Sequence, residues 1–539
     1  MAAAAVRLAG FDELPGAGTR YNVEPQEAVA RWKASKDQGM DLATLITEEL
    51  GVGVCPDSLG RVEVTGVCGD SRAAQPGHVF VALSGSKADG AAFAADAVKR
   101  GAVAVVADRD ADVGPLTAPV IRVPDARAAV ARLARGFYGL GRIQADGRFP
   151  VVGVTGTNGK STFAYMVRAL LQRAGLRPAM LGTIEYDLVG RKVDAALTTP
   201  DAVTLTRHLV EAAGHGADSA VMEVSSHALD QRRTDGIRFA TGVFTNLTQD
   251  HLDYHGTLEN YRDAKRRLFE QLDRSATAVL NAHDPNCDHM AAACRGRVLR
   301  FGLDSRADVR GGILQADIGG GTFVLDVEGR QVSVRTPMVG RHNILNALAA
   351  AAAGLSLGLD LEIIADGIAR LDNVPGRLER VDTGDLGFDI FVDYAHTDDA
   401  LRNVLSAVRP LTRERLWCVF GCGGDRDPYK RPLMARAVTQ GADRFVITSD
   451  NPRTEDPQKI LQDIERGVAN SDRERGTTIA DRREAIQHAI ERLEPGDALI
   501  IAGKGHENYQ ILGTQKIHFD DVEVAREAVA RRQSAACAR

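Results

Sequence analysis

The segment VTGTNGKST, from Val154 to Thr162, has the residue types of a phosphate-binding loop. Gly156 and Gly159 let backbone N–H groups approach a phosphate closely, and Lys160 can reach the β- and γ-phosphates. A hydroxyl directly after the lysine can ligate Mg²⁺. The spacing departs from the usual G-x-x-x-x-G-K-[ST]. The segment nevertheless lies between an apolar strand and a helical pattern, so strand, loop and helix occur in the order that a phosphate-binding loop requires. The sequence therefore predicts an ATP site made by Gly156, Thr157, Asn158, Gly159, Lys160, Ser161 and Thr162.

Two further segments carry residues that can bind metal. Glu223 ends the apolar stretch SAVMEV, where phosphate-transferring enzymes place a metal-binding carboxylate. The later stretch TNLTQDHLDYHG gathers acids and histidines at a strand end, and His251 is a candidate ligand of a second metal. Taken alone, a histidine such as His251 more often belongs to a polar surface, and Lys265 on the following helix is by default a solvated charge.

These residues must be positioned by more than one domain. A chain of 539 residues is too long for a single core at roughly 150 residues per domain. With 44% hydrophobic and 26% charged residues and no apolar run of about 20 residues, we expect a cytoplasmic protein without a membrane span. The formal net charge of −6 disfavours nucleic acid as a partner. The seven cysteines show no C-x-x-C spacing, which argues against a disulfide framework and a zinc site.

The hydrophobic pattern predicts an α/β fold of three domains after a lead-in. Residues 1–40 are expected to be a disordered or extended lead-in, and residues 41–149 a small N-terminal α/β domain. Residues 150–375 should form a central, P-loop ATPase-like domain with a parallel sheet, because VVGVT, SAVMEV and TGVFT are continuously apolar. Residues 376–539 should form a Rossmann-like, doubly wound C-terminal domain. The polar clusters lie at strand carboxyl ends, where such sheets bind ligands.

The ordered motifs resemble one family. GTNGKST, MEVSSH, TNLTQDHLDYHG, GRHNILNALAA, PGRLE and VDYAHTDDAL together look like the Mur ligases of peptidoglycan synthesis, and the resemblance covers about Val67 to Gln510. It implies an ATP-dependent, ADP-forming acid–amino-acid ligase. The γ-phosphate would activate a substrate carboxylate as an acyl phosphate, which an amino group then attacks.

The resemblance also implies roles for single residues. Lys160, His251 and Lys265 would be catalytic. Ser161 and Glu223 would hold one Mg²⁺ and His251 a second, and Lys265 would carry a CO₂-derived carbamate beside the metal. Asn343 would lie near the adenine, with Arg377 and Asp393 around ATP. From the residues alone, Asn343 is also a helix N-terminal residue and Asp393 a strand-end cap.

The segment DNPR resembles the signature of family members that add meso-diaminopimelate to UDP-N-acetylmuramoyl-L-alanyl-D-glutamate. Diaminopimelate differs from L-lysine by a distal carboxylate, which Arg453 can grip with two charge-assisted hydrogen bonds. On its own, DNPR is also compatible with an Asx-type turn. The expected diaminopimelate-binding residues are Arg426, Asp450, Asn451, Pro452, Arg453, Gly503 and Glu507. Those for the UDP-sugar dipeptide are Ser71, Thr198, Thr199, Ser225, Gln231 and Arg233.

Three alternatives remain open on the sequence. The same ligation could use L-lysine if Arg453 points away from the site. A folylpolyglutamate synthase-like ligase has similar phosphate-loop chemistry but should lack DNPR and the GDSR segment of the first domain. A non-catalytic P-loop switch would need neither His251 nor Lys265. We expect a monomer in each case.

Overall fold

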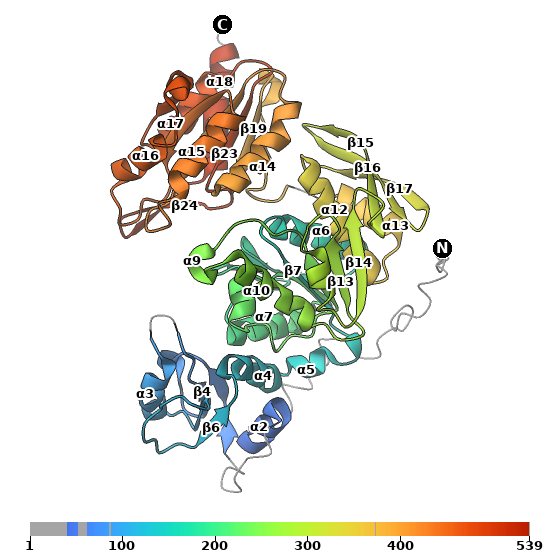
Figure 1. Cartoon of the computed structure of the whole chain (residues 1–539), viewed down its shortest axis with the longest axis vertical. Coiled ribbons are helices and arrows are strands. Elements are labelled where there is room, and N and C mark those ends of the chain that lie inside the picture. Colours follow the sequence, from blue (N-terminus) through green and yellow to red (C-terminus); the bar gives the residue numbers. More distant parts are fainter. Residues whose placement is uncertain (1–39, 52–61, 86–87, 372, 538–539) are drawn as a thin grey trace.

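The computed structural model describes residues 40–51, 62–85, 88–371 and 373–537. The predicted lead-in lies outside the described residues except for Met40. The described chain forms three groups of elements along its long axis, built on a four-stranded, an eleven-stranded and a six-stranded sheet (Figure 1). The predicted α/β class with three sheet-based parts is confirmed. Among the helices of the described part, none combines the length and apolarity needed to cross a bilayer.

The N-terminal group is a parallel sheet in the order β3-β4-β5-β6. Its strands are Gly66–Cys68, His78–Val81, Ala104–Asp108 and Val120–Val123. Its helices are α2 (Leu42–Leu50), α3 (Ala94–Lys99), α4 (Ala126–Tyr138) and α5 (Leu140–Ile143), and β1 (Met40–Asp41) pairs with β2 (Glu63–Val64). Helix α4 begins where Asp125 accepts the Ala128 N–H at 2.9 Å, a side-chain N-cap. Its buried residues, among them Leu133 and Phe137, join the core under the sheet.

The central sheet has the order β10-β9-β8-β11-β7-β12-β13-β14-β15-β16-β17. Its parallel centre comprises β8 (Pro178–Leu181), β11 (Ser219–Glu223), β7 (Val151–Thr155), β12 (Thr241–Phe244), β13 (Thr277–Asn281) and β14 (Arg297–Gly302). Every residue of β7 and β11 is buried, as expected for strands covered on both faces. Because β7, β11 and β12 are parallel, their carboxyl ends lie at the same end of the sheet, and the loops that follow these strands meet there.

Antiparallel strands extend this sheet on both sides and were not predicted. They are β9 (Glu185–Asp187) and β10 (Lys192–Asp194) at one edge, and β16 (Gly320–Val327) and β17 (Arg330–Thr336) beyond β15 (Val309–Asp317) at the other. At the outer edge, β17 alternates exposed residues with buried or half-buried ones, because only one of its faces packs on the core, whereas every residue of β16 is buried or half-buried.

Helices cover both faces of the central sheet. They are α6 (Lys160–Arg173), α7 (Ala202–Gly214), α8 (Ser226–Asp230), α9 (Leu252–His255), α10 (Leu258–Glu270), α11 (Cys287–Ala291), α12 (Arg341–Ser356) and α13 (Leu361–Ala369). Helix α12 is rich in small residues, and its alanines 349–353 are fully buried against α6 and the sheet. Their small side chains permit a close approach of α12, which fixes the phosphate loop at the start of α6 from behind.

The C-terminal sheet has the order β18-β19-β23-β20-β21-β22, parallel except for β18. Its strands are Glu379–Val381, Asp389–Asp393, Ala498–Ala502, Leu416–Cys422, Arg444–Ser449 and Gly476–Thr478 in that order. The helices are α14 (Asp398–Val408), α15 (Lys430–Gly441), α16 (Pro457–Glu465), α17 (Arg482–Glu491) and α18 (Asp521–Cys537), and β24 (Tyr509–Leu512) pairs with β25 (Gln515–His518). A fully buried ion pair, Arg482 to Asp521 at 2.6 Å, joins α17 to α18.

Candidate active site

The phosphate loop lies between β7 and α6 and is held by the loop after β12. The Thr157 N–H donates to the Asn246 carbonyl, and the Asn158 N–H to Asn246 Oδ1, both at 2.9 Å. Gly159 has a φ of +88°, and a Cβ there would stand 2.5 Å from Asn346 Oδ1 on α12. Glycine is therefore required at this turn on both conformational and steric grounds.

Lys160 folds back into this loop. Its Nζ donates to the carbonyls of Gly156 at 3.0 Å and Thr157 at 2.8 Å. Burial lowers the pKa of Lys160, while Glu223 and Asp250 nearby act in the opposite direction. A cation held among backbone carbonyls is placed to meet a phosphate that enters the loop.

Lys265 reaches the same loop from α10. Only 1% of the residue is exposed, and its Nζ donates to the Gly156 carbonyl at 2.8 Å. The Nζ also lies 4.3 Å from the ring centre of Tyr261, whose hydroxyl is 3.2 Å from Thr157 Oγ1. Burial and the charge of Lys160 hold the pKa of Lys265 well below its usual range. Lys265, which the sequence alone would place in solvent, therefore lies buried beside the phosphate loop.

Glu223 and Ser161 flank the loop. Glu223 is 2% exposed, and its carboxylate accepts the Thr183 N–H at 2.9 Å and the Thr183 hydroxyl at 3.0 Å. The Ser161 hydroxyl accepts a hydrogen bond from Arg377 Nη2, which comes from the C-terminal group, at 3.0 Å. In the described part of the chain, no set of three or more His, Cys, Asp or Glu side chains is arranged to hold a metal by itself.

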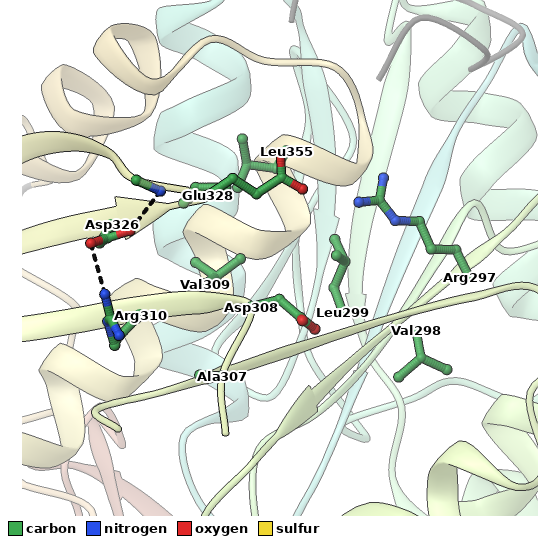
Figure 2. Close-up of a pocket in the computed structure, with 12 residues that line it drawn as sticks. Arg297, Val298, Leu299, Ala307, Asp308, Val309, Arg310, Asp326, Glu328 and Leu355 are labelled. Carbon is green, nitrogen blue, oxygen red and sulfur yellow. Dashed lines mark hydrogen bonds and ion pairs between the residues drawn. The ribbon is translucent and has the colours of Figure 1, made fainter. Parts of the chain in front are cut away.

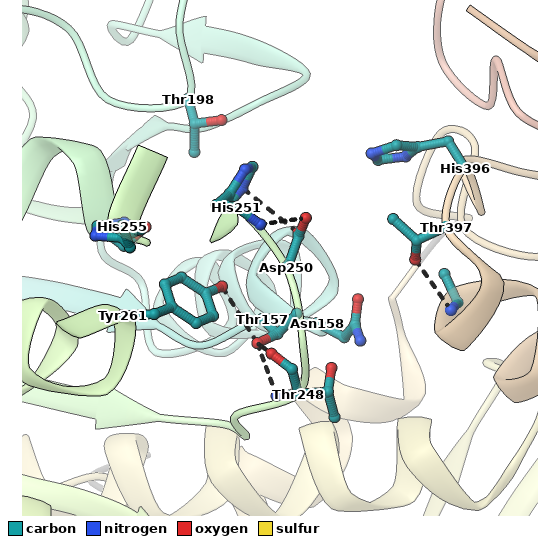
Figure 3. Close-up of polar contacts among 12 residues, drawn as sticks. Thr157, Asn158, Thr198, Thr248, Asp250, His251, His255, Tyr261, His396 and Thr397 are labelled. Carbon is teal, nitrogen blue, oxygen red and sulfur yellow. Dashed lines mark hydrogen bonds and ion pairs between the residues drawn. The ribbon is translucent and has the colours of Figure 1, made fainter. Parts of the chain in front are cut away.

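His251 stands at the mouth of this site, opposite His396 from the C-terminal group (Figure 3). Its backbone is left-handed, with a φ of +53°, and its Nε2 lies 3.4 Å from Asp250 Oδ2. Burial lowers the pKa of His251 to about 4 despite the Asp250 charge, which keeps the imidazole neutral at pH 7. A neutral imidazole is the form that ligates metals.

The C-terminal group touches the phosphate loop directly. Asp399 Oδ2 on α14 accepts hydrogen bonds from Asn158 Nδ2 at 3.2 Å and Thr248 Oγ1 at 3.0 Å. Asp393 is buried, and its carboxylate accepts the backbone N–H groups of Leu378 and Ala395, each at 2.8 Å. Burial raises the pKa of Asp393.

Asn343 lies on α12 behind the loop. Its Nδ2 donates to the Val339 carbonyl at 2.8 Å, and its Oδ1 accepts from Asn346 at 3.0 Å. It is therefore linked through Asn346 to the glycine turn of the phosphate loop.

Most residues expected at the UDP-sugar dipeptide lie together beside β11. Thr199 Oγ1 donates to the Glu223 carbonyl at 2.9 Å and accepts the Ser225 N–H at 3.0 Å. Arg233 donates to the Thr199 carbonyl at 2.8 Å and to Gln231 Oε1 at 2.6 Å. Thr198 lies one residue away, with its hydroxyl 3.0 Å from that of Thr183, the Glu223 partner. Ser71 lies apart in the N-terminal group, half-buried at the start of the short helix Ser71–Ala73.

The acidic residues expected at diaminopimelate lie together at the carboxyl ends of β21 and β23. Asn451 Nδ2 donates to Glu507 Oε2 at 2.9 Å, and Asp450 is 7% exposed. Gly503, with a φ of +119°, follows β23, and a Cβ there would stand 2.9 Å from Asp450 Oδ2. Lys504 lies among them, although the sequence reasoning assigned it no role.

The two arginines of this cluster come from neighbouring loops. Arg453 has a left-handed φ of +51°, follows the buried Pro452, and donates through Nη1 to the Gly424 carbonyl at 2.8 Å. Gly423 lies between the arginines, since a Cβ there would stand 2.9 Å from Arg453 Nη1 and 3.9 Å from Arg426 Cγ. Arg426 is exposed.

A separate hollow of about 370 Å³ is lined by residues of β14 and β15 (Figure 2), and β14 is the third strand from β7 in the order of the central sheet. Leu299, Val309 and Leu355 form its apolar lining, and Arg310 and Asp326 pair at 2.9 Å on its rim. None of the predicted site residues lines it.

The comparisons with known proteins decide the family. Residues 63–138 match the Mur ligase family catalytic domain, residues 154–354 the Mur ligase middle domain, and residues 376–505 the Mur ligase glutamate ligase domain. The chain belongs to the Mur ligase family. As a member it is a ligase, and the family resemblance drawn from the motifs is confirmed.

Individual relatives match over nearly the whole chain. The UDP-N-acetylmuramoyl-L-alanyl-D-glutamate--2,6-diaminopimelate ligase of Geobacillus thermodenitrificans is 43% identical over 92% of this chain and 100% of its own length. The protein of the same name from Solibacter usitatus is 46% identical over 87% and 94%. A solved structure bearing this name matches with a TM-score of 0.66 and 36% identity over 90% of this chain and 99% of that one.

Sequence reasoning missed several residues that complete the site. Thr183 and Tyr261 contact predicted site residues but lie outside the quoted motifs, and Asn246 lies within TNLTQDHLDYHG but was assigned no role. Lys504 stands between two glycines at the end of an apolar strand, a pattern that is also typical of an exposed turn. Asp399 could be assigned only from the fold, since its partners are more than 150 residues away in the sequence.

Proposed function

We propose that this ligase adds meso-diaminopimelate to UDP-N-acetylmuramoyl-L-alanyl-D-glutamate at the expense of ATP. The observation that carries the proposal is the cluster at the ends of β21 and β23, where Asp450, Asn451 and Glu507 gather near Arg453. Acids and an amide suit an ammonium group, and an arginine suits a carboxylate. One amino-acid head carries both groups.

ATP would bind at the loop of residues 156–162. Backbone N–H groups and Lys160 would meet the phosphates, and Arg377 would turn from Ser161 to the nucleotide once it binds. Asn343 would lie towards the adenine and Asp393 beside the nucleotide. Because Arg377 and Asp399 already bridge the two groups, closure around ATP would exclude water from the reacting phosphate.

The residues at the loop fit the two magnesium ions that the family resemblance implies. The hydroxyl of Ser161 and the carboxylate of Glu223 are hard oxygen donors beside the phosphate site, and His251 offers a neutral nitrogen. The absence of a larger acidic set among the described residues agrees with Mg²⁺, which takes few protein ligands and keeps water and phosphate oxygens. When bound, the metals would offset the charge of two approaching anions.

Lys265 fits a carbamate on chemical grounds. Its amine is buried beside a carbonyl and a tyrosine ring, and it forms no hydrogen bond or ion pair with a carboxylate in the described structure. Burial favours the neutral amine, and addition of CO₂ to that amine with loss of one proton would give an anionic carbamate suited to magnesium. An unmodified ammonium at this position would repel the metal.

The reaction would proceed in two balanced steps. A substrate carboxylate oxygen attacks the γ-phosphorus, the bond to the β-phosphate oxygen breaks, and ADP leaves. The amino group of diaminopimelate then attacks the acyl carbon, and the tetrahedral intermediate loses inorganic phosphate and a proton to give the amide. Lys160 would offset the charge that builds on the transferring phosphate.

The dipeptide would lie along Thr198, Thr199, Ser225, Gln231 and Arg233, with the uridine end reaching towards Ser71. In this arrangement the nucleotide sugar would run from residues 41–149, at its uridine end, into residues 150–375, where ATP would also bind, and the amino acid would bind at residues 376–539. A monomer suffices, because one chain supplies all three sets of residues. ATP and nucleotide-sugar substrates favour the cytoplasm as the location.

The alternatives are less well supported. A switch does not need a separate amino-acid site, and a folylpolyglutamate synthase-like ligase does not explain the long matches to diaminopimelate ligases. Addition of L-lysine would leave Arg453 without a carboxylate partner. Phosphate release should therefore require ATP, UDP-N-acetylmuramoyl-L-alanyl-D-glutamate and diaminopimelate together. Release with folate and glutamate instead, or release of phosphate without any acceptor, would contradict the proposal.

A further inference from the structure

Lys504 is the most completely buried cation of the amino-acid cluster. It follows Gly503 at the end of β23, and its side chain is 0% exposed. Its Nζ donates to Asn451 Oδ1 at 3.1 Å and to the Tyr509 carbonyl at 2.7 Å. It also lies 3.4 Å from Asp450 Oδ1 and 3.6 Å from Glu507 Oε2. A single ammonium thus contacts all three residues assigned to the ammonium end of the ligand.

The carboxylates of Asp450 and Glu507 lie close together and need the positive charge of Lys504 to stay ionised. Asp450 and Glu507 are both largely buried, and like charges in a low-dielectric site oppose each other's ionisation. Burial raises the pKa of Glu507 and the Asp450 charge raises it further, while Lys504 acts against both. For Asp450, burial is outweighed by Lys504 and Arg482, and its pKa lies below the usual range. Lys504 therefore supports an ionised acid next to a second one.

The charges nearby can be counted from the contacts. Arg482 behind the cluster is paired with Asp521 at 2.6 Å, so the two cancel. Among the side chains of the cluster that are not exposed, Asp450 and Glu507 oppose Lys504 and Arg453, which gives a formal charge of zero; Arg426 is exposed to solvent and is left out of this sum. The distal head of diaminopimelate is a zwitterion and is also neutral. The distal end of L-lysine carries an ammonium alone and is positive.

We propose that Lys504 is a specificity-determining residue: by balancing Asp450 and Glu507 it tunes the amino-acid site to a neutral, zwitterionic head and against a bare ammonium. The inference rests on the proposed function and deepens it. Arg453 selects for the carboxylate by contact, whereas Lys504 sets the charge that the whole site presents. Lys504 is a positioning residue, because two of its three N–H donors are used by Asn451 and Tyr509 and its ammonium lies beside the carboxylates of Asp450 and Glu507.

Removing the Lys504 charge tests this directly. Lys504→Gln keeps a hydrogen-bond donor but leaves the site with a formal charge of −1, which suits L-lysine. We expect kcat/KM for diaminopimelate to fall, kcat/KM for L-lysine to fall less or to rise, and their ratio to drop by roughly tenfold or more. The ATP dissociation constant, measured by calorimetry, should stay at the wild-type value. Lys459→Met, at an exposed lysine on α16 of the same domain, is the matched control and should leave the ratio unchanged.

A second variant keeps the test decisive if Lys504→Gln does not fold. The double variant Lys504→Gln/Glu507→Gln removes one charge of each sign, so it buries no uncompensated charge, and its ratio should return towards the wild-type value. An unchanged ratio in Lys504→Gln, or a double variant no closer to wild type than the single one, would overturn the inference. Failure of the wild-type protein to use diaminopimelate at all would instead refute the proposed function.

Discussion

Substituting Lys265 separates two roles for its buried amine. Lys265→Arg keeps a positive charge and N–H donors near the Gly156 carbonyl, but a guanidinium stays charged and cannot form a carbamate. If the residue acts as a simple cation on the phosphates, the arginine variant should work. If it acts as a carbamate, both Lys265→Arg and Lys265→Ala should lose activity.

The size of the effect follows from the position of the amine. Its Nζ lies 2.8 Å from a carbonyl of the phosphate loop, so a group there acts directly on the reacting charges. Loss of one preorganised group of this kind lowers kcat by roughly 10² to 10³, or about 3 to 4 kcal/mol. The structural cost of Lys265→Ala is separate: the Gly156 carbonyl loses one of its two lysine donors and keeps Lys160 at 3.0 Å, so the lost hydrogen bond costs about 0.5–1.5 kcal/mol of stability.

The assay is steady-state phosphate release with saturating substrates, with and without added formate or acetate. The alanine variant has room for a small carboxylate, and partial recovery is expected in that variant alone. Lys160→Ala serves as the control that should not recover. Near wild-type activity of Lys265→Arg, or no recovery of Lys265→Ala by any small acid while ATP binding is intact, would refute the carbamate.

Three further substitutions test other parts of the site. Arg453→Leu should lower kcat/KM for diaminopimelate by roughly 10² or more, whereas kcat/KM for L-lysine should change little because lysine has no distal carboxylate. An equal fall in kcat/KM for both amino acids in steady-state kinetics would show that Arg453 does not determine specificity. Gly156→Ala places a Cβ 1.9 Å from Thr245 Oγ1 and should weaken ADP binding measured by calorimetry, with Gly156→Ala/Thr245→Ala recovering part of it; full affinity in the single variant would contradict the close packing of the loop. Arg482→Met leaves Asp521 buried and unpaired and should lower the free energy of unfolding by about 3–5 kcal/mol, measured by urea titration. A loss below about 1 kcal/mol would show that this ion pair does not link α17 to α18 as its burial indicates.

Much of the central site could be predicted because its signals are local. The loop around Lys160 is a contiguous segment between an apolar strand and a helix, so sequence order alone fixes its geometry. The same holds for Glu223, which ends a buried strand. Continuous apolar runs identified the parallel strands, because a strand that is covered on both faces has apolar residues at nearly every position.

The remaining features depend on contacts that no local pattern encodes. The burial of Lys265 follows from the way α10 packs beside the phosphate loop, and its own helix sequence is compatible with solvent. The antiparallel strands β15 to β17 were missed because their alternating, partly polar pattern is weaker than that of the buried strands. Lys504 was passed over because a lysine between glycines suggests an exposed turn, whereas the fold closes β24 and the Asp450 loop around it.

The central claim is that the amino-acid site selects the second carboxylate of diaminopimelate, and a competition experiment tests it most directly. The purified protein would receive ATP, UDP-N-acetylmuramoyl-L-alanyl-D-glutamate and equal concentrations of meso-diaminopimelate and L-lysine, and the products would be identified by mass spectrometry. The account predicts the diaminopimelate adduct in excess by roughly 10² or more. Equal amounts of the two adducts, or a lysine adduct in excess, would contradict it.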